Sequence, residues 1–136
     1  MIVNISSVVG RRALPARGLY SASKFALAGW SEALRLELSL EGISVLVVNP
    51  GLTRTNFSKN LLEATARIRY DHFGGMSADQ VAEKTWSAAA RDWKEITLTG
   101  PGVALILATR FLPRVVDYFA KKKVRDVFAE ELAARS

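Results

Sequence analysis

Three polar side chains near the start of the chain have types and a spacing that suit proton transfer to an oxygen atom. Tyr20 and Lys24 are four residues apart, so on a helix they lie on one face, about one turn from each other. Ser7 follows a short apolar segment that reads as a strand, and parallel sheets place their ligands at the carboxyl ends of strands. We therefore expect a hydroxyl, a phenol and an ammonium group to converge on one point.

These groups suit the interconversion of a carbonyl and an alcohol. During carbonyl reduction, negative charge grows on the oxygen and a proton must reach it. Tyr20 can supply that proton, and Ser7 can hold the oxygen by a hydrogen bond. Because a nearby cation favours the charged form of a phenol, Lys24 would stabilise the tyrosinate that acts as the base in the reverse direction.

Strands and a long helix must position this set. Residues 2–5 form a brief strand, residues 8–18 a loop broken by glycine and proline, and a helix follows from about residue 20 to residue 40, stopped by Gly42. Residues 43–48 are almost all apolar, which is typical of a parallel strand covered on both faces. The pattern predicts an α/β fold.

The predicted helix over residues 20–40 has two apolar stripes, although a helix packed on one sheet needs only one. The first stripe contains Leu27, Trp30, Leu34 and Leu38, and the second contains Phe25, Gly29, Ala33, Leu36 and Leu40. The second stripe predicts a partner surface, and hence a homo-oligomer through helix 20–40. Burial against another helix of the same chain is the alternative.

The rest of the chain supplies a second set of elements. Residues 56–76 form a long connection, apolar for a loop and typical of a lid over a binding site. Ser77 and Gln80 form a capping box that opens a helix to about residue 91. We expect this helix to face the core with Val81, Ala82, Thr85, Trp86 and Ala89, and a last strand to cover residues 95–98.

The C-terminal segment is both apolar and basic. Residues 103–112 are an apolar run, and a further helix is expected over residues 114–134. Residues 110–125 contain six Lys or Arg and one acid, so residues 103–125 could contact a membrane surface or a partner without spanning a bilayer. A solvated helix face is the alternative.

Composition excludes several classes of site and partner. The chain has 136 residues, a formal net charge of +6, no cysteine and one histidine, so we expect no disulfide and no metal site. It has no recognised nucleic-acid motif, and we expect no nucleic-acid partner. No signal peptide precedes the first strand, which predicts a cytoplasmic protein with an option of membrane association.

Three segments together resemble the short-chain dehydrogenase/reductase family. They are Asn-Ile-Ser-Ser ending at Ser7, Tyr-Ser-Ala-Ser-Lys over residues 20–24, and Asn-Pro-Gly-Leu-Thr-Arg-Thr over residues 49–55. The resemblance implies catalytic roles for Ser7, Tyr20 and Lys24. It also implies cofactor contacts from Tyr20, Lys24, Pro50, Gly51, Thr53 and Thr55. The Tyr-x-x-x-Lys spacing alone is weak evidence, since Tyr118 and Lys122 share it without a strand-end serine.

The resemblance implies an oxidoreductase that uses NAD or NADP and acts on a small, apolar carbonyl or alcohol. It covers the C-terminal half of a Rossmann-like doubly wound sheet, in residues 1–100, and leaves residues 101–136 as a helical tail. No glycine-rich phosphate-binding turn occurs in the sequence, so we expect the isolated chain to be inactive and strand 2–5 to have an open edge. A non-catalytic dimerisation or interaction module derived from such an enzyme is the alternative.

Overall fold

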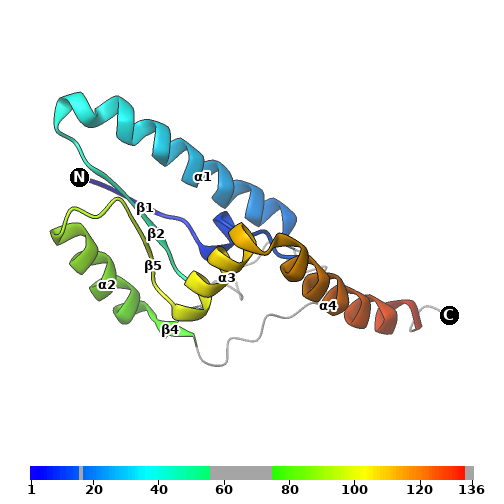
Figure 1. Cartoon of the computed structure of the whole chain (residues 1–136). Helices are drawn as coiled ribbons and strands as arrows, with labels where there is room; N and C mark the ends of the chain where they lie inside the picture. Colours follow the sequence, from blue (N-terminus) through cyan, green and yellow to red (C-terminus); the bar gives the residue numbers. More distant parts are fainter. Residues whose placement is uncertain (16, 56–74, 134–136) are drawn as a thin grey trace.

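The computed structural model describes residues 1–15, 17–55 and 75–133 (Figure 1). The predicted lid, which includes His72, therefore lies almost entirely outside the described residues. The elements in chain order are β1 (Ile2–Ile5), the 3-10 helix η1 (Val8–Gly10), α1 (Gly18–Glu37), the 3-10 helix η2 (Leu38–Glu41), β2 (Val45–Asn49), β3 (Thr53–Arg54), β4 (Met76–Ser77), α2 (Ala78–Ala90), β5 (Glu95–Thr97), α3 (Gly100–Phe111) and α4 (Pro113–Ala133).

The main sheet contains three parallel strands in the order β1-β2-β5. Figure 1 shows α1 on one side of this sheet and α2 on the other. All five residues of β2 are buried, as expected for a central strand with a helix on each face. The predicted α/β fold with a parallel sheet is confirmed, and β1 is an edge strand of the sheet.

The register shows which side chains face which helix. Asn4 pairs with Val47 and Val47 with Glu95, so these three side chains point to the same face. Asn4 Nδ2 donates a hydrogen bond to Ser31 Oγ of α1 at 2.9 Å, which identifies this face as the α1 side. On the opposite face Leu46 and Val48 pack against Ala88 of α2 and Leu98, and this cluster is the apolar core of the α2 side.

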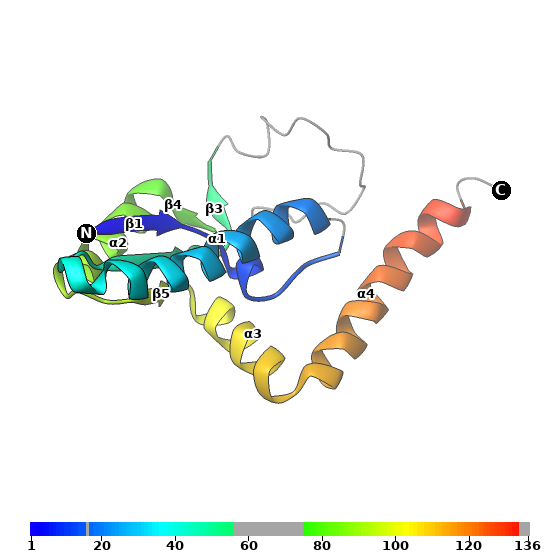
Figure 2. The same cartoon turned by 90° about the horizontal axis from the view of Figure 1, so that it is seen from above.

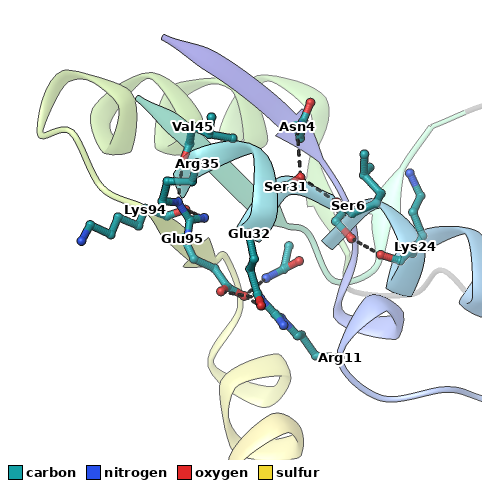
Figure 3. A network of polar contacts seen from close by, with 12 residues as sticks. Asn4, Ser6, Arg11, Lys24, Ser31, Glu32, Arg35, Val45, Lys94 and Glu95 are labelled. Carbon is teal, nitrogen blue, oxygen red and sulfur yellow. Dashed lines mark hydrogen bonds and ion pairs between the residues drawn. The ribbon is translucent and has the colours of Figure 1, made fainter. Parts of the chain in front are cut away.

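Helix α1 lies close to the sheet because its contact face is lined by small side chains, the buried Ser21, Ala28 and Ser31. Arg35 crosses the sheet edge and donates hydrogen bonds to the carbonyl oxygens of Val45, at 3.1 Å, and Lys94, at 2.8 Å (Figure 3). The helix passes into η2 and stops at Gly42, as predicted, where φ is +66°. Polar contacts therefore help to hold α1 against the sheet.

The two apolar stripes of α1 differ in burial. In the first, Leu27, Leu34 and Leu38 are half-buried, but Trp30 is 55% exposed because the smaller neighbour Ser31 occupies the contact with the sheet. The second stripe is exposed throughout, and Leu40 at its end is 95% exposed. The alternative, that this stripe is buried against another helix of the same chain, is therefore wrong for the part of the chain that the structure describes.

Helix α2 begins at the predicted capping box, in which Ser77 Oγ accepts from Gln80 N at 3.2 Å and Gln80 Oε1 accepts from Ser77 N at 2.9 Å. The prediction for its inner face was partly wrong. Ala82 is exposed, and so is Trp86, at 78%. Ala88 takes the buried position, and two residues correspond to about 200° around a helix, so Trp86 must point away from the core.

A second, two-stranded parallel sheet pairs β3 with β4, joining Thr53 to Met76 and Arg54 to Ser77. The sequence did not predict this sheet, because two-residue strands carry no periodic pattern. The pairing fixes the segment after β2 against the start of α2.

Helices α3 and α4 form a V that leaves the sheet at the end of β5 (Figure 2). The Thr99 hydroxyl accepts a hydrogen bond from Gly102 N at 3.3 Å and so caps α3. Arg12 in the loop after β1 forms an ion pair with Asp117 of α4 at 2.7 Å. Within the described ranges, no helix combines the length and the hydrophobicity needed to cross a bilayer. The division of the chain at about residue 100 stays a prediction.

Candidate active site

Ser7 lies two residues beyond the end of β1, at the carboxyl edge of the sheet. Its hydroxyl oxygen accepts a hydrogen bond from Val9 N at 3.3 Å and caps η1. The same hydroxyl donates to the carbonyl oxygen of Pro50 at 3.4 Å, and Val8 N donates to that oxygen at 3.0 Å. Two segments of the predicted site, the serine after β1 and the Pro-Gly turn after β2, are therefore in contact.

Tyr20 and Lys24 lie in the first two turns of α1, which brings them to the same edge. Lys24 Nζ donates a hydrogen bond to the carbonyl oxygen of Ile5, the last residue of β1, at 2.9 Å. The same atom lies 5.7 Å from the centre of the Tyr20 ring. The ammonium therefore lies beside the phenol ring and at the end of β1, two residues before Ser7. The convergence of all three groups on one point stays a prediction.

A close contact between η1 and α1 holds this arrangement. Ser6 is buried and donates its hydroxyl hydrogen to the carbonyl oxygen of Lys24 at 3.1 Å. A Cβ added to Gly10 would lie 2.6 Å from Ser6 Oγ and 2.8 Å from the Lys24 carbonyl oxygen. The sequence marked Gly10 as a loop breaker, but its place in the structure is a point of close approach between two backbones.

The remaining predicted cofactor contacts follow β2. Gly51 packs on Thr99, since an added Cβ would lie 2.7 Å from Thr99 Oγ1. Thr53 in β3 donates its hydroxyl hydrogen back to the Gly51 carbonyl oxygen at 3.2 Å, and Thr55 lies exposed just beyond β3. Pro50 thus contacts Ser7, Gly51 and Thr53 shape the turn, and Thr55 stands at the outer end of this segment.

A charged network that the sequence did not predict lies beside the site (Figure 3). Arg11 binds both carboxylate oxygens of Glu95, at 2.9 and 2.7 Å, and one oxygen of Glu32 on α1 at 2.7 Å. The Glu95 carboxylate also accepts from Nδ2 of the fully buried Asn49 at 2.6 Å. Hydrogen bonds to Glu95 are the largest cause of the raised pKa of Arg11, against an opposing effect of burial.

The network connects four parts of the site. Arg11 belongs to the loop after Ser7, Glu32 to α1, Asn49 to the end of β2, and Glu95 to the start of β5. No local pattern could have revealed it, because Arg11 and Glu95 are 84 residues apart in the chain. It fixes the segments that carry Ser7, Tyr20 and Pro50 relative to one another.

Comparisons with known proteins agree with this geometry. A family model described as short chain dehydrogenase matches residues 1–66. The chain is 34% identical over 126 residues to a dehydrogenase/reductase SDR family protein 7-like of Anopheles gambiae, and 52% identical over 60 residues to the uncharacterized oxidoreductase YbbO of Escherichia coli K12. The matches cover 90% and 44% of this chain.

The folded structure also resembles solved enzymes. A short-chain dehydrogenase from Burkholderia cenocepacia, solved in complex with NADP, superposes with a TM-score of 0.72 at 21% identity, over 88% of this chain and 46% of that one. The chain spans 40% of the length of the mosquito relative and 22% of the bacterial one. With its parallel sheet, its Rossmann-like neighbours and these relatives, the chain belongs to the short-chain dehydrogenase/reductase family.

Proposed function

We propose that residues 1–100 form the nicotinamide-side half of an NAD(P)-dependent oxidoreductase that interconverts a carbonyl and an alcohol. The contact that carries the proposal is the hydrogen bond from Lys24 Nζ to the Ile5 carbonyl oxygen at 2.9 Å. It holds the ammonium beside both the Tyr20 ring and the end of β1, two residues before Ser7. The apolar character of residues 56–76 supports a small, apolar substrate.

Each of the three side chains has one role in this proposal. Tyr20 donates a proton to the carbonyl oxygen during reduction and accepts it during oxidation. Ser7 donates a hydrogen bond to the same oxygen, in exchange for its present bond to Pro50. Lys24 stabilises the charged phenolate and offers its remaining N–H donors to the ribose hydroxyls of the cofactor.

The residues present fit one end of a dinucleotide. A bound nicotinamide would supply or accept the hydride at the substrate carbon. The residues that would contact the nicotinamide end of the cofactor are Tyr20, Lys24, Pro50, Gly51, Thr53 and Thr55. The 136 residues contain no glycine-rich turn, so we place the site for the pyrophosphate and adenine outside them. We also place the residue that selects between NAD and NADP outside these 136 residues.

Calorimetric titration of the 136-residue chain with NADH and NADPH tests this division. Because only the nicotinamide end has contacts, we expect no affinity tighter than about 1 mM, which corresponds to roughly −4 kcal/mol. Micromolar binding would contradict the proposal, since it would require a complete cofactor site within these residues.

A chimaera tests the catalytic residues. The part of the E. coli oxidoreductase that precedes its matched segment would be joined to residue 1, because that relative is 52% identical over the 60 matched residues. In an active chimaera, Tyr20→Phe should lower kcat by about 10²–10⁴-fold and leave cofactor affinity nearly unchanged. Tyr118→Phe is the matched control, since it has the same Tyr-x-x-x-Lys spacing on another helix. Turnover retained by Tyr20→Phe would refute the assignment.

A non-catalytic interaction module is the second candidate, favoured by the exposed stripe on α1. In either case we propose that this stripe, which includes Phe25, Leu36 and Leu40, joins two copies of the chain. Sedimentation velocity should show a dimer that dissociates more readily after Leu36→Glu. Dimerisation by a chimaera that shows no turnover would favour the module over the enzyme.

A further inference from the structure

The corner between α3 and α4 combines exposed apolar side chains with exposed cations. Helix α3 ends at Phe111, and α4 begins at Pro113 after the single residue Leu112. Val115 N and Val116 N both donate to the Leu112 carbonyl oxygen, at 3.1 and 3.2 Å, so the turn is tightly built. Figure 2 shows this corner protruding from the body of the molecule.

Apolar side chains cover the outside of the corner. Phe111 is 70% exposed and Leu112 58% exposed, which is unusual for side chains of this size. The exposed set continues along both arms and comprises Leu107, Phe111, Leu112, Val115 and Phe119, which we name the apolar corner. Leu107 and Phe111 are four residues apart on α3, and Val115 and Phe119 are four apart on α4, so each pair lies on one side of its helix.

The inner sides of the two helices are occupied differently. Leu105, Ile106 and Thr109 are half-buried on α3, and Val116 and Ala120 are half-buried on α4. On α3 the apolar corner lies roughly opposite the half-buried side chains, and on α4 it lies about 100° around the helix from them. It is therefore an exposed apolar surface separate from the half-buried faces of the two helices.

Cations flank the apolar corner on both arms. Arg110, Arg114, Lys121, Lys122 and Lys123 are all exposed, and Arg125 is exposed as well. Asp117 is the one acid among residues 110–125, and its carboxylate binds Arg12 of the loop after β1. The electrostatic field around the corner is therefore positive, because residues 110–125 contain six cations and a single acid, which is paired with Arg12.

We infer that the apolar corner and its flanking cations dock the protein peripherally on an anionic lipid bilayer. The large side chains enter the boundary between headgroups and acyl chains, while the cations remain among the lipid phosphates. Neither the apolar corner nor the cations would suffice alone, since stable peripheral binding takes two signals, such as an apolar insertion and a polybasic patch. Charge complementarity favours this occupant over a second copy of the chain, whose corner carries the same positive charge.

Vesicle co-sedimentation of the full chain tests the inference. We expect binding to phosphatidylcholine vesicles that contain phosphatidylserine, weak binding to phosphatidylcholine alone, and a loss of binding at high salt. Lys122→Gln with Lys123→Gln should weaken binding about 25-fold, at roughly fivefold per interfacial cation. Arg91→Gln with Lys94→Gln is the matched control. It removes the same charge from the exposed turn between α2 and β5 and should change binding little.

The apolar residues separate a lipid surface from other anions. Phe111→Ser with Leu112→Ser should weaken binding to the anionic vesicles by about tenfold or more, with the far-ultraviolet circular dichroism unchanged. Unchanged binding by this variant would mean attraction to any polyanion, including nucleic acid, and would overturn the inference. Absence of binding at low salt would overturn it too. A change of oligomeric state in this variant, without vesicle binding, would assign the corner to contact between copies.

Discussion

Replacement of Glu95 by alanine should destabilise the fold by about 2–4 kcal/mol. The carboxylate is the hydrogen-bond acceptor for Asn49, which is fully buried. Leaving that buried amide donor unpaired costs about 1–3 kcal/mol. The pair with Arg11 is partly exposed, with side-chain exposures of 26% and 35%, so screening by water limits its share to about 1 kcal/mol. The two contributions give the expected range.

Urea denaturation followed by far-ultraviolet circular dichroism measures the change in the free energy of unfolding. Glu32→Ala is the control, because it removes only the outer contact to Arg11, made by a side chain that is 51% exposed, and should cost about 0–1 kcal/mol. Equal losses for Glu95→Ala and Glu32→Ala would refute the reasoning, since they would show that the buried Asn49 amide does not depend on Glu95.

The raised pKa of Arg11 determines how its contribution to the free energy of unfolding depends on pH. The pKa of Arg11 is raised in the folded state, chiefly by hydrogen bonds to Glu95. A raised pKa of a cation adds stability that is fully present below the unfolded pKa and is lost only as pH rises through the folded pKa. Since both lie in the strongly alkaline range, the Arg11 contribution should stay constant in the denaturation assay between mildly acidic and mildly alkaline pH.

Three further changes test other parts of the fold. Gly10→Ala should destabilise the protein by about 1–3 kcal/mol, because the new methyl group meets the Lys24 carbonyl oxygen, which can move only with α1. Thermal unfolding that is unchanged by this substitution would contradict the close approach. Ser77→Ala removes the cap of α2 and should cost about 1 kcal/mol in urea denaturation, and no loss would mean that the capping box adds nothing. In sedimentation velocity, Leu36→Glu should shift a dimer toward monomer, and an unaltered dimer would exclude the α1 stripe as its interface.

Local patterns were enough to predict most of the elements. The alternation of apolar runs, the stop at Gly42 and the capping box at Ser77 are signals that act within a few residues, and the structure has each of them. The spacing of Ser7, Tyr20 and Lys24 likewise depends on one strand, one loop and one helix. The position of Lys24 beside the Tyr20 ring and the end of β1 could therefore be predicted without knowledge of the rest of the chain.

Features that depend on distant residues could not be predicted. The hydrogen bonds of Arg11 to Glu95 join segments 84 residues apart, and no sequence pattern near either residue predicts them. Trp86 is predicted on the core-facing side of its helix, but the rotation of α2 is set by the contact of Ala88 with the sheet. Pairing of β3 with β4 rests on two residues in each strand and has no periodicity. Tertiary contacts decide all three.

The side chains of Val3 and Ile5 limit what kind of molecule can extend the sheet beyond β1. Both point to the α2 side, since they pair with Leu46 and Val48, but α2 covers only the neighbouring strands and leaves these two side chains partly exposed. A single added strand would satisfy the backbone of β1 and still leave an apolar face in water. The smallest piece able to complete this edge is therefore a strand together with a helix that lies over Val3 and Ile5, so an isolated strand peptide should not suffice.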